Sequence, residues 1–470
     1  MERKGRGLTE MEGQRDAANK LLRIMYFTLI ISVMNATIFN VVLTSIREEF
    51  RLTASQVSWM TTGYGIMYAI GSVTYGKLAD RYRLKDLLTF GFILMVTGSL
   101  LGLLAQHYGM MVAGRMLQAA GGAVIPAVSM IIPAKYFPPE NRGRAIGTMV
   151  SGLALGTAIS PIAASLVTGM LHWRMLFCFS LFILLVLPVF RKYLQEEPER
   201  TGSKLDWIGG FLLAGTIALI LLAITYSSWQ FFGTGFVFSA LFILRIRSAE
   251  EPFVQPALFH NRRYVLGVGI ALLAASLSSG MPFIMPQLLT NISHISPAFI
   301  GFVMFPGAMA SALLGRTGGK LADERGSGFL FYLAAAPLLV SFGILSVFPG
   351  MPPAYIWIFL ILASTGQTYI QVATSNSVSL TLSQEHMGIG MGFLTMMTFI
   401  IGAVSTSLIG KVLDWGALVQ LNPLLYHEQA MSYSNAFSLL FTVLLVVVAL
   451  YSMLVRARKT VGSSISSTQK

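Results

Sequence analysis

Long apolar runs separated by short polar segments form the main pattern of this sequence. A membrane-spanning helix needs about 20 predominantly apolar residues. The chain of 470 residues contains fourteen candidate runs, at roughly 22–45, 56–77, 86–106, 109–133, 145–169, 174–191, 206–226, 229–246, 265–289, 297–316, 328–348, 354–379, 388–411 and 433–455. Only a short break at Ser227–Ser228 separates the seventh run from the eighth. We therefore predict an all-α integral membrane protein with fourteen transmembrane helices.

Basic residues gather in alternate loops. The second loop carries Arg81, Arg83 and Lys85, and both terminal segments are rich in lysine and arginine, whereas the fifth loop has only Arg174. Lysine and arginine concentrate in the cytoplasmic loops of membrane proteins. We therefore expect both termini in the cytoplasm, which requires an even number of helices.

The composition agrees with a membrane protein. Charged residues make up 11% of the chain and hydrophobic residues 54%, whereas soluble proteins carry about 25% charged residues. The net charge of +13 comes from basic residues in short loops, so we expect a lipid bilayer and no nucleic acid as partner. The lone Cys178 supports neither a disulfide nor a metal site.

An internal repeat suggests two related halves. The string GKLAD occurs at Gly76–Asp80 and Gly319–Asp323, each time after an apolar run and at the start of a basic loop. The copies lie eight helices apart, so two extra helices stand between six-helix units. We predict a cytoplasmic tail at 1–20, an N-terminal bundle at 21–200, two linker helices at 201–250, a C-terminal bundle at 251–457 and a tail at 458–470. Transporters built from such repeats bind substrate between the halves, near the bilayer midplane.

Four stretches carry a family resemblance: GKLADRYRLK at Gly76–Lys85, RMLQAAGGA at Arg115–Ala123, GTAISPIAAS at Gly156–Ser165 and MNATIFNVVL at Met34–Leu43. They resemble motifs of the major facilitator superfamily, in its fourteen-helix drug:proton antiporter branch. The chain is most similar to the tetracycline-efflux proteins of Gram-positive bacteria. The resemblance runs to about helix thirteen, is strongest in the first half, and implies the major facilitator fold: two six-helix bundles plus two extra central helices.

The loop after helix two is the most specific of these motifs. Gly76 permits close helix approach, and Asp80 can accept hydrogen bonds from a helix N-terminus or pair with arginine. Such contacts can latch the cytoplasmic side closed, and the alternative is a loop that only sets topology. Arg83 replaces the family's second glycine. The predicted gating residues are Gly76, Asp80, Arg81, Lys85, Gly319 and Asp323.

Helices four and five carry the residues that the family links to coupling and bending. An arginine inside a membrane helix should face the protein interior or a wet cavity, and the resemblance assigns Arg115, with Gln118, to proton coupling. The alternative is that Arg115 extends to the membrane surface. Pro161 should bend helix five, and Gly156 belongs to the same motif, although Ser160 replaces one of its glycines.

Polar residues on four helices are candidates for a substrate cavity. Helix twelve places Gln367, Gln371 and Ser375 close to one face, and polar groups facing lipid would be costly. Helix nine, with Pro282 and Pro286, is predicted to be broken and to line the cavity. The alternative role for these polar residues is pairing between helices. The candidates are Asn35, Asn40, Tyr64, Gln287, Gln367, Gln371 and Ser375.

The sequence contains no nucleotide-binding loop of the G-x-x-x-x-G-K-[ST] type, so we predict a secondary transporter with no cofactor and a proton gradient as its energy source. Because every acidic residue lies near a helix end, proton coupling is implied by the resemblance alone. We expect a monomer in a bacterial cell membrane that exports small amphipathic molecules. The alternatives are an importer or uniporter, or a membrane sensor without transport. An enzyme is disfavoured because no paired acids or nucleophile–base pair are evident.

Overall fold

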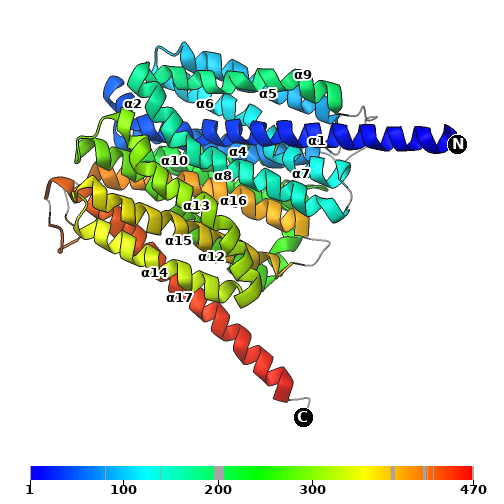
Figure 1. Ribbon diagram of the computed structural model, residues 1–470. Helices are drawn as coiled ribbons and strands as arrows, with labels where there is room; N and C mark the ends of the chain where they lie inside the picture. The colour runs from blue at the N-terminus through cyan, green and yellow to red at the C-terminus, as the bar shows by residue number, and fades with distance from the viewer. Residues whose placement is uncertain are drawn as a thin grey trace. The chain divides into compact units, whose positions relative to one another are not determined.

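The computed structural model describes residues 2–79, 81–137, 139–194, 206–382, 387–415, 420, 422–426 and 428–467, which contain helices and no strand. Figure 1 shows the arrangement of the long helices. In chain order the helices are α1 (Glu2–Thr37), η1 (Ile38–Val42), α2 (Leu43–Glu49), α3 (Ala54–Val57), α4 (Trp59–Leu78), α5 (Leu84–Leu103), α6 (Tyr108–Gly122), α7 (Val124–Tyr136), α8 (Pro139–Met170), η2 (Trp173–Phe182), α9 (Ile183–Tyr193), α10 (Trp207–Tyr226), α11 (Trp229–Ser248), η3 (Pro256–His260), α12 (Arg262–Asn291), α13 (Pro297–Arg325), α14 (Ser327–Val347), α15 (Pro353–Ser379), α16 (Met387–Trp415), η4 (Glu428–Ala430) and α17 (Met431–Ser467).

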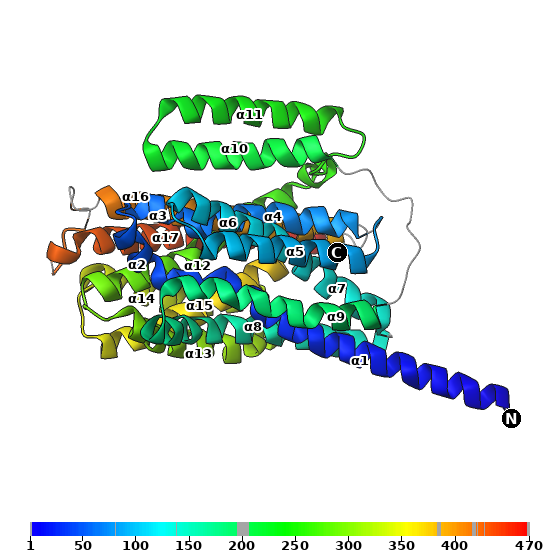
Figure 2. The ribbon, with the colours of Figure 1, turned by 90° about the horizontal axis from the view of Figure 1, so that it is seen from above.

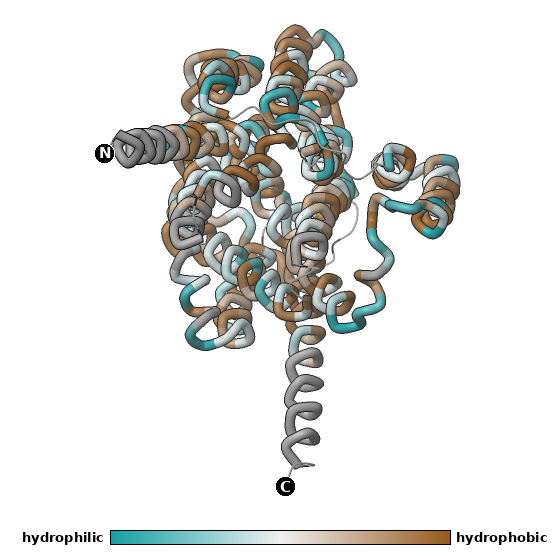
Figure 3. The backbone as a smooth tube through the Cα atoms, turned by 90° about the vertical axis from the view of Figure 1, so that its right-hand side faces the viewer, coloured by the Kyte–Doolittle hydropathy of each residue, from teal (hydrophilic) through white to brown (hydrophobic). Residues whose placement is uncertain are grey.

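Thirteen stretches in the described part of the chain are long and apolar enough to cross a membrane. The remaining predicted span corresponds to α4, which has 20 residues but is less apolar because it contains buried polar groups such as Thr62, Tyr64 and Tyr68. Figure 3 colours the backbone by hydropathy. The all-helical prediction is therefore confirmed, with thirteen to fourteen spans.

The seventh and eighth predicted spans are separate helices. Figure 2 shows α10 and α11 side by side, and Phe211 contacts Phe238 across the pair with ring centroids 6.2 Å apart. The chain turns at Ser227, whose φ of 51° lies in the left-handed region. Large apolar side chains of α11 are exposed, among them Trp229 and Phe236, as a lipid-facing helix requires.

Contacts divide the chain into two units. Unit 1 contains Met1–Ser45, Trp59–Ile220 and Trp229–Phe253, and unit 2 contains Ile46–Ser58, Leu221–Ser228 and Val254–Lys470. Each unit repeats one packing pattern: α1 packs on α8 as α12 packs on α16, α4 on α6 as α13 on α15, and α5 on α6 as α14 on α15. This recurrence supports the internal repeat, while the predicted domain boundaries stay a prediction.

Glycines hold α5 and α6 in backbone contact in unit 1. A Cβ atom at Gly98 would lie 2.5 Å from the backbone N of Gln118 and from the carbonyl O of Gly114. One at Gly121 would overlap the carbonyl O of Gly91. Small residues allow such close approach between membrane helices, and here they bring the polar face of α6 against α5.

Three local predictions need correction or refinement. Helix nine is not broken, because α12 continues through Pro282 and Pro286 to Asn291. The second GKLAD copy does not open a loop, because α13 continues to Arg325. Helix five also continues through Pro161. A proline inside a helix removes one backbone hydrogen bond, and neighbouring helices can compensate for that loss in a membrane protein.

Candidate functional site

Arg115 is the centre of a buried polar cluster in unit 1. Its side chain is 0% exposed, so the alternative of an arginine that extends to the membrane surface is wrong. Its Nη1 donates to the carbonyl O of Asn35 at 3.0 Å and to Gln118 Oε1 at 2.9 Å. Its Nε donates to the carbonyl O of Met60 at 3.4 Å. The side chain thereby joins α6 to α1 and α4.

Two aromatic rings also contact the guanidinium group. Its carbon lies 4.4 Å from the ring centroid of Phe39 and 4.2 Å from that of Tyr64. Aromatic faces attract cations electrostatically. Of the ion pairs in the described part of the chain, Asp206–Arg245 and Lys320–Glu324, neither involves Arg115. Neutral oxygens and ring faces, with no carboxylate, therefore stabilise this charge.

Gln118 extends the cluster to two further elements. Its Nε2 donates to Ser99 Oγ on α5 at 2.8 Å and to Ser180 Oγ on η2 at 2.9 Å, and these two serines also hydrogen-bond each other. The amide therefore has both its donor and its acceptor side satisfied, as a buried polar group requires. The family resemblance assigned both Arg115 and Gln118 to coupling, and the structure places their side chains in one hydrogen-bond network.

The structure brings together only some of the predicted cavity residues. Asn35 and Tyr64 contact Arg115, whereas Asn40 accepts a hydrogen bond from Thr61 at 3.3 Å. In unit 2, Gln367 donates to the carbonyl O of Leu277 at 3.0 Å, which joins α15 to α12. The described contacts of Asn40 and Gln367 are therefore those of pairing between helices.

The other cavity candidates have different surroundings. Gln287 on α12 is buried, and its Nε2 donates to the carbonyl O of Phe283 at 3.0 Å. On α15, Gln371 is exposed, Ser375 is half-buried and Thr374 is buried. The predicted polar face is therefore not uniformly exposed, and its role in substrate binding stays a prediction.

The predicted gating loop is described only in part. Asp80 and the side chain of Asp323 lie outside the described residues. Among the described residues, a Cβ atom at Gly76 or Gly319 would meet no atom within 4 Å, so the expected close helix approach at Gly76 is wrong. Gly156 is different, because its Cβ would lie 2.9 Å from the carbonyl O of Ile30, where α8 meets α1.

The remaining loop residues lie near helix ends. Arg81 lies over the ring of Tyr82, 5.6 Å from its centroid, and Lys85 lies in the first turn of α5. Neither observation establishes a latch on the cytoplasmic side, so the gating role of these residues stays a prediction.

Asp414 is a structural carboxylate that sequence reasoning did not assign. Its two oxygens accept hydrogen bonds from the backbone N–H groups of Ala54 and Ser55 at 2.7 and 3.0 Å. These groups open the short helix α3, which also has a capping box between Thr53 and Gln56. The T-x-x-Q pattern is a sequence signal for a helix start, but it does not reveal an acceptor 360 residues away along the chain. Within unit 2, Asp414 ties α16 to the segment Ile46–Ser58.

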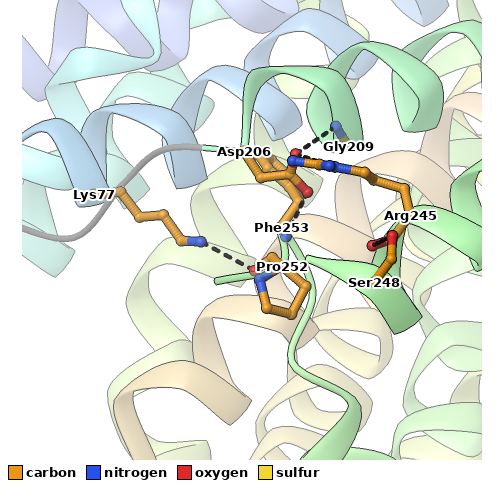
Figure 4. A network of polar contacts seen from close by, with 7 residues as sticks. All are labelled: Lys77, Asp206, Gly209, Arg245, Ser248, Pro252 and Phe253. Atoms are coloured by element: carbon orange, nitrogen blue, oxygen red, sulfur yellow. Dashed lines mark hydrogen bonds and ion pairs between the residues drawn. The ribbon is translucent and has the colours of Figure 1, made fainter. Parts of the chain in front are cut away.

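A second unassigned carboxylate, Asp206, anchors the base of the α10–α11 hairpin (Figure 4). It is 4% exposed and accepts hydrogen bonds from Gly209 N–H at 3.0 Å, Arg245 Nε at 3.0 Å and Phe253 N–H at 3.3 Å. Lys77, at the end of α4, donates to the carbonyl O of Pro252 at 3.2 Å. The GKLAD motif thus contacts the end of the hairpin within unit 1.

Replacing Asp206 by asparagine is expected to loosen the hairpin base. Burial raises the pKa of Asp206, but the bonds from Gly209, Arg245 and Phe253 outweigh burial and hold the pKa below its ordinary value. The carboxylate therefore stabilises the fold at pH values above the ordinary pKa of aspartate. This stabilisation is lost as the pH falls through the pKa that Asp206 has in the folded protein. At pH 7, D206N should destabilise this region by about 2 kcal/mol, measured as faster hydrogen exchange at 206–210 and 245–253. The difference from wild type should shrink below about pH 4, and Glu251→Gln, an exposed carboxylate in the same loop, is the matched control.

Comparisons with known proteins identify the family. The family model described as the Major Facilitator Superfamily matches residues 25–406. The chain belongs to the major facilitator superfamily. It is therefore a multi-pass membrane protein and a secondary transporter of small molecules, not an enzyme.

Its relatives differ in substrate. The chain is 22% identical over 423 residues to the "Riboflavin transporter RibZ" of Clostridioides difficile (strain 630), covering 89% of this chain and 91% of that protein. It is 25% identical over 356 residues to "Multidrug resistance protein 3" of Bacillus subtilis (strain 168), covering 72% and 68%. It is 26% identical over 329 residues to "Lincomycin resistance protein LmrB" of the same organism, covering 66% and 68%.

Solved structures show the same fold. A bacterial homologue of the human lysosomal transporter Spinster superposes with a TM-score of 0.66 at 15% identity, covering 94% of this chain and 97% of that chain. A point mutant of the peptide transporter POT also superposes with a TM-score of 0.66, at 14% identity, covering 93% and 95%. At these identities the likeness concerns the fold alone.

Proposed function

We propose that this transporter exports small amphipathic molecules, of drug or tetracycline type or endogenous metabolites, from a bacterial cytoplasm by proton antiport with alternating access. The observation that carries the proposal is the buried Arg115–Gln118 pair, which stands where the antiporter branch has its coupling arginine. The names of two relatives, a multidrug resistance protein and a lincomycin resistance protein, support export of drug-like molecules.

Import is the second candidate function. It stays open because the name of the riboflavin transporter, whose match covers most of both chains, gives no direction of transport. The two directions differ in a simple assay. An exporter lowers the accumulation of its substrate in energised cells and loses this effect with an uncoupler, whereas an importer raises accumulation.

The assay uses cells that express the transporter or carry the empty vector, with riboflavin, lincomycin and tetracycline as probes. Export predicts that expressing cells accumulate less of at least one probe and that an uncoupler removes the difference. Higher accumulation in expressing cells would replace export by import. Equal accumulation of all three probes would contradict export of these compounds.

We also propose that both termini are cytoplasmic, that the bundles are 21–200 and 251–457 with 201–250 between them, and that the transporter acts as a monomer. The lysine and arginine pattern supports the orientation. Fusing a reporter that is fluorescent only in the cytoplasm to each terminus tests it, and a dark fusion at either end would contradict it.

A further inference from the structure

Arg115 holds the backbone at two interruptions of membrane helices. The first span changes from α-helix to 3₁₀-helix at Ile38–Val42, and the second is interrupted at Ser58, between α3 and α4. Arg115 donates to the carbonyl O of Asn35 just before the first interruption and to that of Met60 just after the second. A 3₁₀ stretch within a helix often marks a hinge. Arg115 therefore stabilises the present geometry of one candidate hinge, Ile38–Val42, and of the junction between α3 and α4.

The segment between these interruptions leaves unit 1. The chain passes to unit 2 at Ile46 and returns to unit 1 at Trp59. Within unit 2 this segment packs on α16 through the Asp414 contacts with Ala54 and Ser55. Arg115 therefore hydrogen-bonds to the chain before and after the segment Ile46–Ser58, which belongs to unit 2. Loss of these two bonds would release the chain on both sides of that segment.

The same cluster has unused hydrogen-bonding groups. Arg115 Nη2, Asn35 Nδ2 and Tyr64 OH are buried and have no partner at hydrogen-bonding distance among the described residues, although the Tyr64 and Asn35 side chains interact with each other. All three belong to side chains that contact one another, since Asn35 Oδ1 lies 3.4 Å from Arg115 Nη1 and the Tyr64 ring lies 4.2 Å from the guanidinium carbon. Buried polar groups without partners are unusual and carry a free-energy cost, so these atoms call for an acceptor at some stage of the transport cycle.

We infer that Arg115 is a switch that binds one anionic oxygen group of the transported solute and in exchange releases the carbonyl groups of Asn35 and Met60. Nη2 of Arg115, Nδ2 of Asn35 and the hydroxyl of Tyr64 supply the donors. The inference rests on the proposed transport function and names the substrate class: an amphipathic monoanion, such as a carboxylate or an ionised enol. Because the donors are enclosed in this conformation, binding is tied to rearrangement of the two interruptions.

The charge balance favours a monoanion over other solutes. The cluster holds one positive charge and two ring faces, and none of its described members is a carboxylate that would attract a cation. A phosphate dianion would leave one negative charge unpaired, and an unpaired charge is costly in a membrane interior. A carboxylate matches the fork of the guanidinium group.

The test compares three ligands that share one apolar body: 2-naphthoate, 2-naphthamide and 2-naphthylmethylamine. Binding to the purified transporter in nanodiscs is measured by calorimetry. The carboxylate should bind about tenfold more tightly than the amide or more, the ratio that corresponds to about 1.4 kcal/mol. Hydrogen exchange at 38–42 and 58–62 should rise when the carboxylate binds. Equal binding of the three ligands, no binding by any of them, or unchanged exchange would overturn the switch.

Variants separate the switch from folding defects. Arg115→Gln should abolish the preference for the carboxylate, Arg115→Lys should retain part of it, and Arg174→Gln, a half-buried arginine of the same unit, should leave it intact. If Arg115→Gln did not fold, Arg115→Lys would still test the switch, because its preference for the carboxylate should be lower than that of the wild type. An unreduced preference in Arg115→Lys would contradict binding by the fork of the guanidinium group. Gradient-driven flux in Arg115→Gln at the wild-type rate would overturn the switch and leave the transport function standing. Carboxylate binding without gradient-driven flux would support the switch and contradict the transport function.

Discussion

Gly98→Val is expected to remove most of the folded transporter from the membrane. The first atom of any side chain at this position would lie 2.5 Å from backbone atoms of both Gln118 and Gly114. Backbone atoms cannot move aside as a flexible side chain can, so α5 and α6 must separate. Overpacking costs about 1–3 kcal/mol in ordinary cores and more where nothing can yield. Separation would also break the bond from Gln118 to Ser99 and disturb Arg115.

The measurement is the yield of monodisperse protein after detergent extraction, together with its midpoint of thermal unfolding. The matched control is Gly269→Val on α12, a helical glycine whose Cβ would meet no atom within 4 Å. Both changes replace glycine by valine in a helix, so they share the same change in helix propensity. We expect loss of yield and a lower thermal midpoint for the Gly98 variant alone. Normal yield and thermal midpoint for the Gly98 variant would mean that α5 and α6 do not approach as closely as described.

Asp414→Ala is expected to release α3 from α16. The carboxylate holds two backbone N–H groups at 2.7 and 3.0 Å, and hydrogen bonds to charged groups contribute about 1.5–3 kcal/mol each. Losing them should raise the population in which the segment Ile46–Ser58 has left α16 by about tenfold or more, since about 1.4 kcal/mol corresponds to a factor of ten. Transport should slow, because one conformation of the cycle loses stability. Asp414→Asn, which keeps one acceptor oxygen, should have an intermediate effect.

Cysteine labelling measures this release. The chain has a single cysteine, Cys178, so Cys178→Ser gives a background in which Ser55→Cys is the only thiol. Ser55 is 1% exposed, and a maleimide should label the cysteine at this position slowly. In the Asp414→Ala background labelling should be about tenfold faster, and Glu428→Ala, an exposed acid near the start of α17, should not change it. Equal rates in all three backgrounds would show that Asp414 does not hold α3.

The sequence predicted the elements that depend on composition and local period. Apolar runs located the spans because a lipid-facing helix must be apolar along about 20 residues. The cost of an arginine in a membrane predicted that Arg115 faces the protein interior or a wet cavity, and the structure buries it. Hydropathy identifies α4 as a span less clearly than the other helices. It has the length of a span, but its buried tyrosines and threonines make it more polar.

Features that depend on contacts between distant segments could not be predicted. Nothing local shows that Asn35 and Met60 supply carbonyl groups to Arg115, or that Asp414 caps a helix far away in the chain. The glycine at position 76 resembled a close-packing site, yet its surroundings are open, whereas Gly98 outside any motif is the tighter position. Spacing along a helix identifies a face but does not identify what packs on it.

Flux through purified transporter in proteoliposomes tests most directly whether the protein moves a solute on the energy of a proton gradient. Riboflavin, lincomycin and tetracycline are the probes, with an imposed pH difference, a protonophore control and liposomes without protein. At least one probe should move faster when the gradient is imposed, the protonophore should abolish the acceleration, and Arg115→Gln should reduce it by about tenfold or more. Flux of all three probes equal to that of protein-free liposomes, or transport indifferent to the gradient, would contradict the account.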